Sequence, residues 1–124
     1  MLLCFINMDK TDFELHIPGM NFCGPGTNFT DRLEEDGVTP KAWSKPVDRV
    51  DEISFKHDMF YNLHKGTRER CEADAGMIRE LKNITNPTCK ERVERGVAIM
   101  CLSVKRFFVL AWIRLDNLIS SINN

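Results

Sequence analysis

Residues 47–65 read VDRVDEISFKHDMFYNLHK, and the spacing of the residues in this stretch predicts an amphipathic helix. Pro46 precedes the stretch and Gly66 follows it, so we expect the helix to begin after the proline and to stop at the glycine. His57 is expected to point inward, whereas its neighbour Asp58 is turned by about 100° and faces elsewhere. The inward face carries at helical intervals Val50, Ile53, Ser54, His57 and Tyr61.

Two more helices are expected after this one. Residues 67–83, TRERCEADAGMIRELKN, predict a second helix whose apolar face includes Cys71, Asp74, Ile78 and Leu81. Residues 87–124 predict a long amphipathic C-terminal helix, with Pro87 in its first turn. One apolar stripe of this helix is expected to enter the core for the most part: Val97, Met100, Val104, Phe108, Ala111, Leu115, Leu118 and Ile122.

The whole chain, 124 residues and 14.3 kDa, has the size of one compact domain. We expect an N-terminal arm over residues 1–17, a long shaped loop over residues 18–46, and a helix pair over residues 47–83 before the C-terminal helix. The loop region contains four of the five prolines, and long ordered loops often carry function. The sequence therefore predicts a mainly α protein with an isolated short hairpin at most.

Charge and cysteine content limit the classes of partner and compartment. A formal net charge of −1 gives no reason to expect nucleic acid as a partner. The five cysteines show no CxxC spacing, so we expect thiols. With no secretory signal visible in the first residues, thiols favour the cytosol or a virion.

Three features point to chemistry when they are taken together: FCGPG (22–26) in the loop, HDMFY (57–61) on the first helix, and Asp74 on the second. Singly, a GPG is usually a turn and a His-Asp dipeptide is usually a helix-surface pair. Calcium prefers hard oxygen ligands, and glycines allow a loop to bend its carbonyl oxygens toward one point. Loop carbonyls and the Asp58 carboxylate therefore predict a calcium site. With one carboxylate, its dissociation constant is expected on the order of 10⁻⁴ to 10⁻³ M.

The order of these features resembles the phospholipase A2 superfamily, in particular the disulfide-free domain in the minor capsid protein of parvoviruses. The resemblance runs from about Ile17 to Leu81. It implies a calcium ion held by the carbonyls of Phe22, Gly24 and Gly26 and by the carboxylate of Asp58. It also implies a general base and its supporting groups: His57, Asp74 as the partner of His57, Tyr61 bonded to that aspartate, and the Gly24 amide as oxyanion donor.

The secreted, disulfide-rich branch of the superfamily carries cysteines where this chain has Ile53, Ser54 and Phe60. This departure disfavours that branch. The resemblance implies calcium-dependent hydrolysis of the sn-2 ester of phospholipids by a water that His57 activates, and in a viral setting it implies membrane breach during entry. Two alternatives remain open: a catalytically inactive membrane-binding or interaction module, and a structural calcium-binding protein.

The C-terminal helix suggests partners besides the phospholipid membrane surface. Between Val97 and Ile113 several of its faces are apolar, so part of it is expected to meet another subunit or a lipid surface. Self-association through this helix is the leading hypothesis.

Several other residues have interpretations outside the proposed chemistry. We attribute Asp48, Asp51 and Glu52 to favourable interaction with the dipole of the first helix. His16 and His64 are expected to lie at exposed positions. Trp43 and Phe29 are expected either to seat the loop on a membrane or to anchor it in the core.

Overall fold

A computed structural model describes residues 17, 19–23 and 28–123 of the chain. Apart from Ile17, the expected N-terminal arm lies outside the described residues. So do Gly24 and Gly26, two of the expected calcium ligands.

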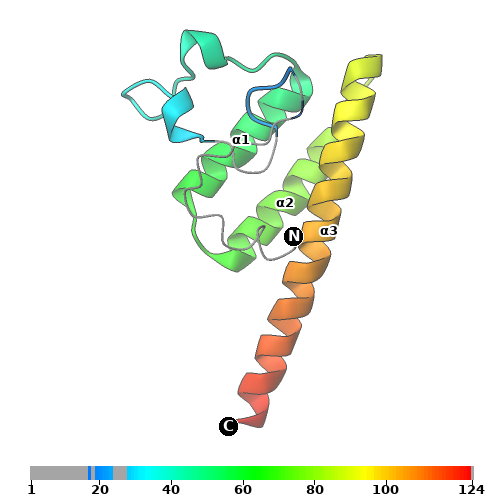
Figure 1. The fold of residues 1–124 in the computed structure, drawn as a ribbon. Helices are drawn as coiled ribbons and strands as arrows, with labels where there is room; N and C mark the ends of the chain where they lie inside the picture. Colours follow the sequence, from blue (N-terminus) through cyan, green and yellow to red (C-terminus); the bar gives the residue numbers. More distant parts are fainter. Residues whose placement is uncertain (1–16, 18, 24–27, 124) are drawn as a thin grey trace.

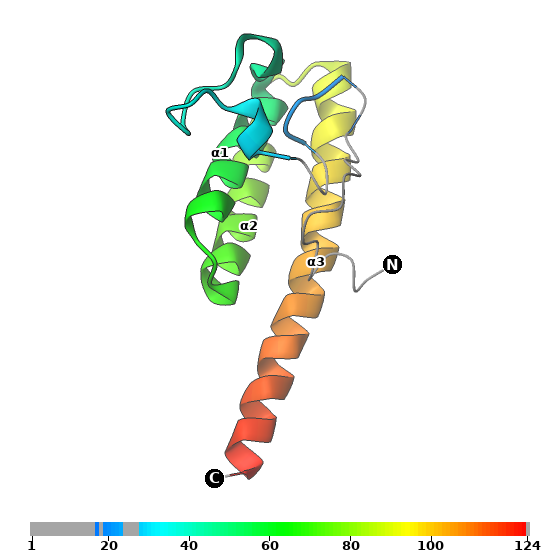
Figure 2. The ribbon, with the colours of Figure 1, turned by 60° about the vertical axis from the view of Figure 1, so that its left-hand side comes forward.

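Three α-helices dominate the described part of the chain: α1 Arg49–Leu63, α2 Thr67–Lys82 and α3 Cys89–Ile122. Before them, the loop contains two short 3-10 helices, η2 Thr30–Arg32 and η3 Ala42–Ser44, and an isolated bridge between Leu33 and Pro40. α1 and α2 run antiparallel, and α3 packs mainly on α2 before extending well past the pair (Figures 1 and 2). The prediction of a mainly α fold, with two antiparallel helices after a loop and a long C-terminal helix, is confirmed.

Capping side chains mark the starts of α1 and α3, whereas α2 begins after a glycine. Asp48 caps α1 by accepting a hydrogen bond from the Asp51 amide at 2.9 Å. Gly66 caps the start of α2 and does not stop α1, which already ends at Leu63.

Thr88 caps α3 in a reciprocal capping box with Glu91. Pro87 precedes this cap, so the prediction that it occupies the first turn is wrong. The hydroxyl of Thr88 can satisfy an orphan amide at the helix start, and proline has no comparable side-chain acceptor.

Two apolar clusters hold these elements together. The first lies among the three helices and the segment before the GPG sequence, and consists of Met20, Cys23, Val50, Met77, Leu81 and Ala98. The second joins the loop to the outer side of α1, where Phe22, Phe29 and Leu33 pack with Phe55 and Met59. The predicted inward face of α2 is confirmed, because Cys71, Asp74, Ile78 and Leu81 are all buried.

The orientation of α3 is the reverse of the prediction. The stripe expected in the core is exposed, from 38% at Val97 to 74% at Ile122. The side that meets α1 and α2 buries Glu91, Glu94 and Ala98 instead. Charged side chains can be buried there because they are paired with opposite charges, as Glu91 is with Arg49.

Arg49 and Glu91 join the start of α1 to the start of α3. The Arg49 Nε and Nη2 atoms donate to Glu91 Oε1 and Oε2 at 2.8 and 2.7 Å, a two-pronged geometry that favours strong pairing. These hydrogen bonds from Arg49 lower the pKa of Glu91 to about 2.

We predict that Glu91→Gln lowers the free energy of unfolding by about 1 to 2 kcal/mol at neutral pH, because a charge-assisted pair is lost. Since the pKa of Glu91 is depressed in the folded state, its contribution is complete above the ordinary value of 4.5 and disappears as the pH falls toward 2. Urea unfolding over that range measures the difference, with exposed Glu80→Gln on α2 as control. A difference that is independent of pH would contradict the assignment.

Candidate active site

The antiparallel packing of α1 and α2 brings His57 and Asp74 together. His57 Nε2 lies 2.6 Å from Asp74 Oδ1, and the Asp74 side chain is only 1% exposed. A carboxylate at Nε2 favours the imidazole tautomer that carries its proton there. The lone pair on His57 Nδ1 is then available to accept a proton, which is the requirement for a general base.

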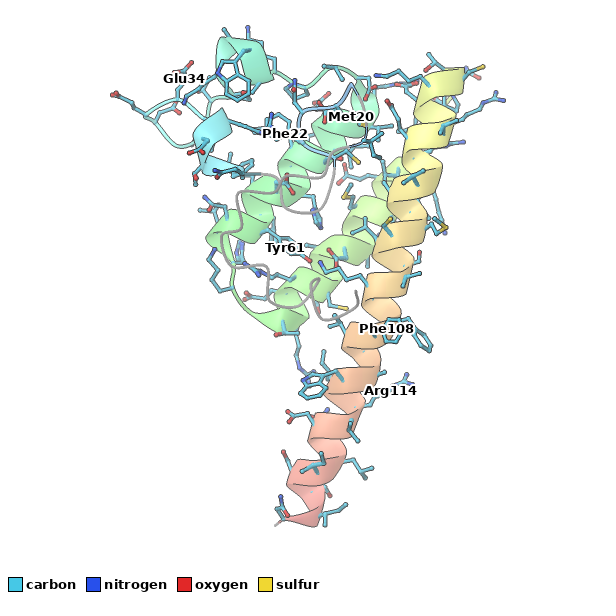
Figure 3. The ribbon with its side chains drawn as sticks, in the orientation of Figure 1. Met20, Phe22, Glu34, Tyr61, Phe108 and Arg114 are labelled. Atoms are coloured by element: carbon cyan, nitrogen blue, oxygen red, sulfur yellow. The ribbon has the colours of Figure 1, made fainter. Side chains whose placement is uncertain are left out.

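Tyr61 lies one helical turn after His57 and completes this arrangement between α1 and α2 (Figure 3). Its hydroxyl donates to Asp74 Oδ1 at 2.6 Å, and its ring centroid is 4.4 Å from that of His57. Burial and the bond to Asp74 both raise the pKa of Tyr61 above its usual range. The phenol therefore stays protonated and remains a donor to Asp74.

Opposing effects set the charge states of the pair. Burial is the largest effect on His57 and disfavours its charged form, but the carboxylates of Asp58 and Asp74 outweigh it and raise the pKa of His57. Burial likewise disfavours the charged form of Asp74, yet the contacts from His57, Lys105 and Tyr61 prevail and lower its pKa. Asp74 is thus held as a carboxylate that can stabilise an imidazolium.

Asp58 presents a partly buried carboxylate on the Nδ1 side of His57. Its Oδ1 atom lies 3.6 Å from His57 Nδ1, and its buried Oδ2 atom has no hydrogen-bond partner among the residues the structure describes. Burial raises the pKa of this carboxyl. A buried oxygen of this kind is costly unless a cation or donor meets it, so Asp58 suits a metal ligand.

The side chains of the described residues do not form a metal site on their own, because no three His, Cys, Asp or Glu side chains converge. Further ligands for a cation beside Asp58 would have to be backbone carbonyls. Of the three carbonyls that the sequence singled out, only that of Phe22 lies among the described residues. The Phe22 ring is 1% exposed and packs edge-on against Phe29 and Phe55, which fixes this residue beside α1.

Asp51 anchors the segment that leads into the GPG sequence. Its fully buried carboxylate accepts hydrogen bonds from the backbone amides of Phe22 at 2.7 Å, Asn21 at 3.0 and 3.1 Å, and Val47 at 3.1 Å. The explanation by helix dipole alone is therefore wrong for Asp51. Asp51 and Asp58 are seven residues apart and share one helical face, which is the signal in the sequence that could have revealed this role.

Lys105 on α3 is a second residue that sequence reasoning missed. Its Nζ atom lies 3.0 Å from Asp74 Oδ2 and donates a hydrogen bond to the Tyr61 hydroxyl. A charge within the apolar run of α3 was visible in the sequence, and such a charge needs a partner. The identity of that partner depends on how α3 packs.

The other candidates lie apart from this cluster. His64 stacks on Phe60 at the end of α1, with ring centroids 3.9 Å apart, and His16 lies outside the described residues. Of the two loop aromatics, Phe29 is buried, whereas Trp43 is 62% exposed with the Arg32 guanidinium over its ring. Trp43 is therefore not the core anchor of the loop.

A small helical domain with a buried His–Asp pair and a neighbouring carboxylate beside a shaped loop has the layout of a water-activating hydrolase. The family model of the Phospholipase A2-like domain matches residues 13–95, well over half of the chain, and the protein belongs to this family. No curated protein and no solved structure gives a significant match. The matched range contains His57, Asp58, Tyr61 and Asp74 but ends before Lys105.

We predict that Asp51→Asn lowers the free energy of unfolding by about 2 to 3 kcal/mol, because an amide nitrogen would face backbone donors in a buried site. Glu52→Gln is the matched control. This neighbour is exposed and pairs with Lys56 at 3.6 Å, so its loss should cost less than about 0.5 kcal/mol. If urea unfolding gives equal losses of unfolding free energy for the two variants, Asp51 contributes only a general interaction with the helix dipole.

Proposed function

We propose that the protein is a calcium-dependent phospholipase A2 that hydrolyses the sn-2 ester of glycerophospholipids. The observation that carries the proposal is the 2.6 Å contact between His57 Nε2 and Asp74 Oδ1, in a chain that belongs to the Phospholipase A2-like family. Side-chain chemistry supports it, because the pair places an imidazole whose Nδ1 can accept a proton beside a buried carboxylate.

In the proposed reaction, His57 Nδ1 accepts a proton from a water molecule as the water oxygen attacks the sn-2 carbonyl carbon. Asp74 stabilises the resulting imidazolium and keeps the ring oriented. The imidazolium then returns the proton to the leaving glycerol oxygen as the ester bond breaks. A side-chain nucleophile is not required, and the products are a fatty acid and a lysophospholipid.

Calcium is proposed as the cofactor, held by Asp58 and by the carbonyls of Phe22, Gly24 and Gly26. The buried Asp58 Oδ2 without a partner among the described residues supports this assignment, as does the anchoring of Phe22 by Asp51. When bound, the ion would supply positive charge for the substrate phosphate and for the oxyanion. The Gly24 amide is proposed as a second donor to that oxyanion.

A phospholipid membrane is the proposed partner of α3. By length and composition α3 could cross a membrane. Lys105 and Arg106 interrupt its apolar stretch, however, and contact α2, so we favour a helix that lies at the lipid surface. Its outward stripe is wider than a coiled-coil seam because Phe107 and Trp112 flank it, and both are more than 60% exposed. Self-association through the same stripe is the competing proposal.

We further propose membrane breach during viral entry as the biological use of this activity. The resemblance to the capsid-type domain of parvoviruses supports this proposal. The described cysteines Cys23, Cys71, Cys89 and Cys101 are free thiols, as in a domain that does not rely on disulfides.

We predict that the protein releases sn-2 fatty acid from mixed phospholipid vesicles in calcium, and that His57→Gln lowers kcat at least about 100-fold. Chelator should abolish release, whereas His64→Gln, at the end of the same helix, should retain it. Chromatographic fatty-acid analysis and dye leakage from the vesicles follow the reaction. Calcium binding without fatty-acid release would instead favour an inactive membrane-binding module.

We also predict that Phe107→Ser combined with Trp112→Ser lowers binding to ether-linked phosphatidylcholine vesicles at least about tenfold, because two large apolar side chains leave the lipid surface. Ether linkage prevents hydrolysis, so vesicle sedimentation reports binding alone. Asn117→Ser is the control, because Asn117 lies on another side of the part of α3 that extends past α1 and α2. Unchanged vesicle binding together with a stable dimer in analytical ultracentrifugation would assign the stripe to a second copy of the chain.

A further inference from the structure

Lys105 is the residue of α3 that contacts Asp74 of the His57–Asp74 pair. Its Nζ atom lies 3.0 Å from Asp74 Oδ2, donates a hydrogen bond to the Tyr61 hydroxyl, and sits 4.4 Å from the centroid of the Tyr61 ring. The Lys105 side chain is 21% exposed, so most of it is withdrawn from water. Lys105 thus contacts Asp74 and Tyr61, which in turn both contact His57.

The contact with Asp74 balances the charge of a buried carboxylate. A general base must be neutral before it accepts a proton, and at that stage neither His57 nor Tyr61 carries a charge to balance the buried Asp74 carboxylate. An isolated buried carboxylate is strongly disfavoured. The Lys105 ammonium supplies the missing positive charge on the Oδ2 side, while Oδ1 remains bonded to His57 and Tyr61.

The contact with Tyr61 fixes the direction of a proton. Lysine has donors and no acceptor, so the Tyr61 hydroxyl must accept from Lys105 and use its own proton elsewhere. Asp74 Oδ1 lies 2.6 Å from that hydroxyl, whereas the Arg70 carbonyl oxygen lies 3.3 Å away. Lys105 therefore directs the hydroxyl proton toward Asp74.

We propose that Lys105 is a positioning residue of the active site, which acts through Asp74 and Tyr61 to keep Asp74 ionised and the His57–Asp74 pair oriented, and that α3 is thereby part of the catalytic apparatus. This inference rests on the proposed phospholipase function. It goes beyond that function because Lys105 lies outside the residues that match the family.

Arg106 provides the matched control, because it is the next residue on α3 and also contacts α2. Its Nε atom donates to the Cys71 carbonyl oxygen at 3.2 Å, one helical turn from Asp74. Arg106→Met removes a cation and a contact between helices, as Lys105→Met does, but leaves Asp74 and Tyr61 with their partners. A role limited to docking α3 predicts the same kinetic result for both variants.

The test is steady-state hydrolysis of phospholipid vesicles in calcium by the full chain and three variants. We expect Lys105→Met to lower kcat by about 10- to 100-fold with KM and calcium affinity changed less than about twofold, as is typical when a supporting group of a site is removed. Lys105→Arg should recover part of the rate, and Arg106→Met should stay within about threefold of the native kcat. Equal kcat losses in the two methionine variants, or a change in KM alone, would overturn the inference.

A second measurement does not depend on turnover. Tyr61 is the only tyrosine of the chain, so ¹³C labelling of the tyrosine Cζ atom gives one NMR resonance. Lys105→Met should shift this resonance and Arg106→Met should leave it in place. An unshifted resonance in Lys105→Met would overturn the inference. If the native protein releases no fatty acid, the proposed function fails and the positioning role falls with it, whereas an active native protein that is insensitive to Lys105→Met overturns the positioning role alone.

Discussion

The buried carboxylate of Asp74 is the constraint around which the three helices are arranged. Asp74 lies on α2, and its carboxylate is contacted by His57 and Tyr61 of α1 and by Lys105 of α3. Each partner offsets part of the cost of burying the charge, and none of them lies within a turn of Asp74 in the sequence. Helix packing and the chemistry of the site therefore depend on each other, since a helix that moved would leave a buried charge without a partner.

A second buried carboxylate, that of Asp51, holds the loop against α1, just as that of Asp74 holds side chains from the three helices together. It accepts hydrogen bonds from the backbone amides of Asn21, Phe22 and Val47, and the Phe22 ring packs in the apolar cluster on α1. The loop thus reaches α1 by both polar and apolar contacts immediately before the GPG sequence. Asp51 and Asp58 share one face of α1, so the residue that anchors the loop and the residue proposed to hold calcium are aligned along the same helix.

α3 shows that a hydrophobic stripe does not by itself identify the buried face of a helix. The charged side chains of Glu91, Lys105 and Arg106 meet the domain, and Phe108 projects away from α1 and α2 (Figure 3). Arg49, Asp74 and the Cys71 carbonyl oxygen meet the charges of Glu91, Lys105 and Arg106, and Ala98 adds apolar packing on the same side of α3. The apolar side is left exposed in the described part of the chain.

The sequence by itself determined the three helices and the inward faces of α1 and α2, on which His57, Tyr61 and Asp74 lie, because helical spacing fixes which side chains share a face, whereas the family resemblance implied that these three residues form one site. It also determined the resemblance that the family match confirms. Only the tertiary structure decided that Asp51 binds the loop, that Lys105 reaches Asp74, and that the stripe of α3 faces outward. Those outcomes depend on contacts between residues 29 to 44 positions apart in the chain, and local periodicity carries no information about which distant partner will satisfy a buried charge.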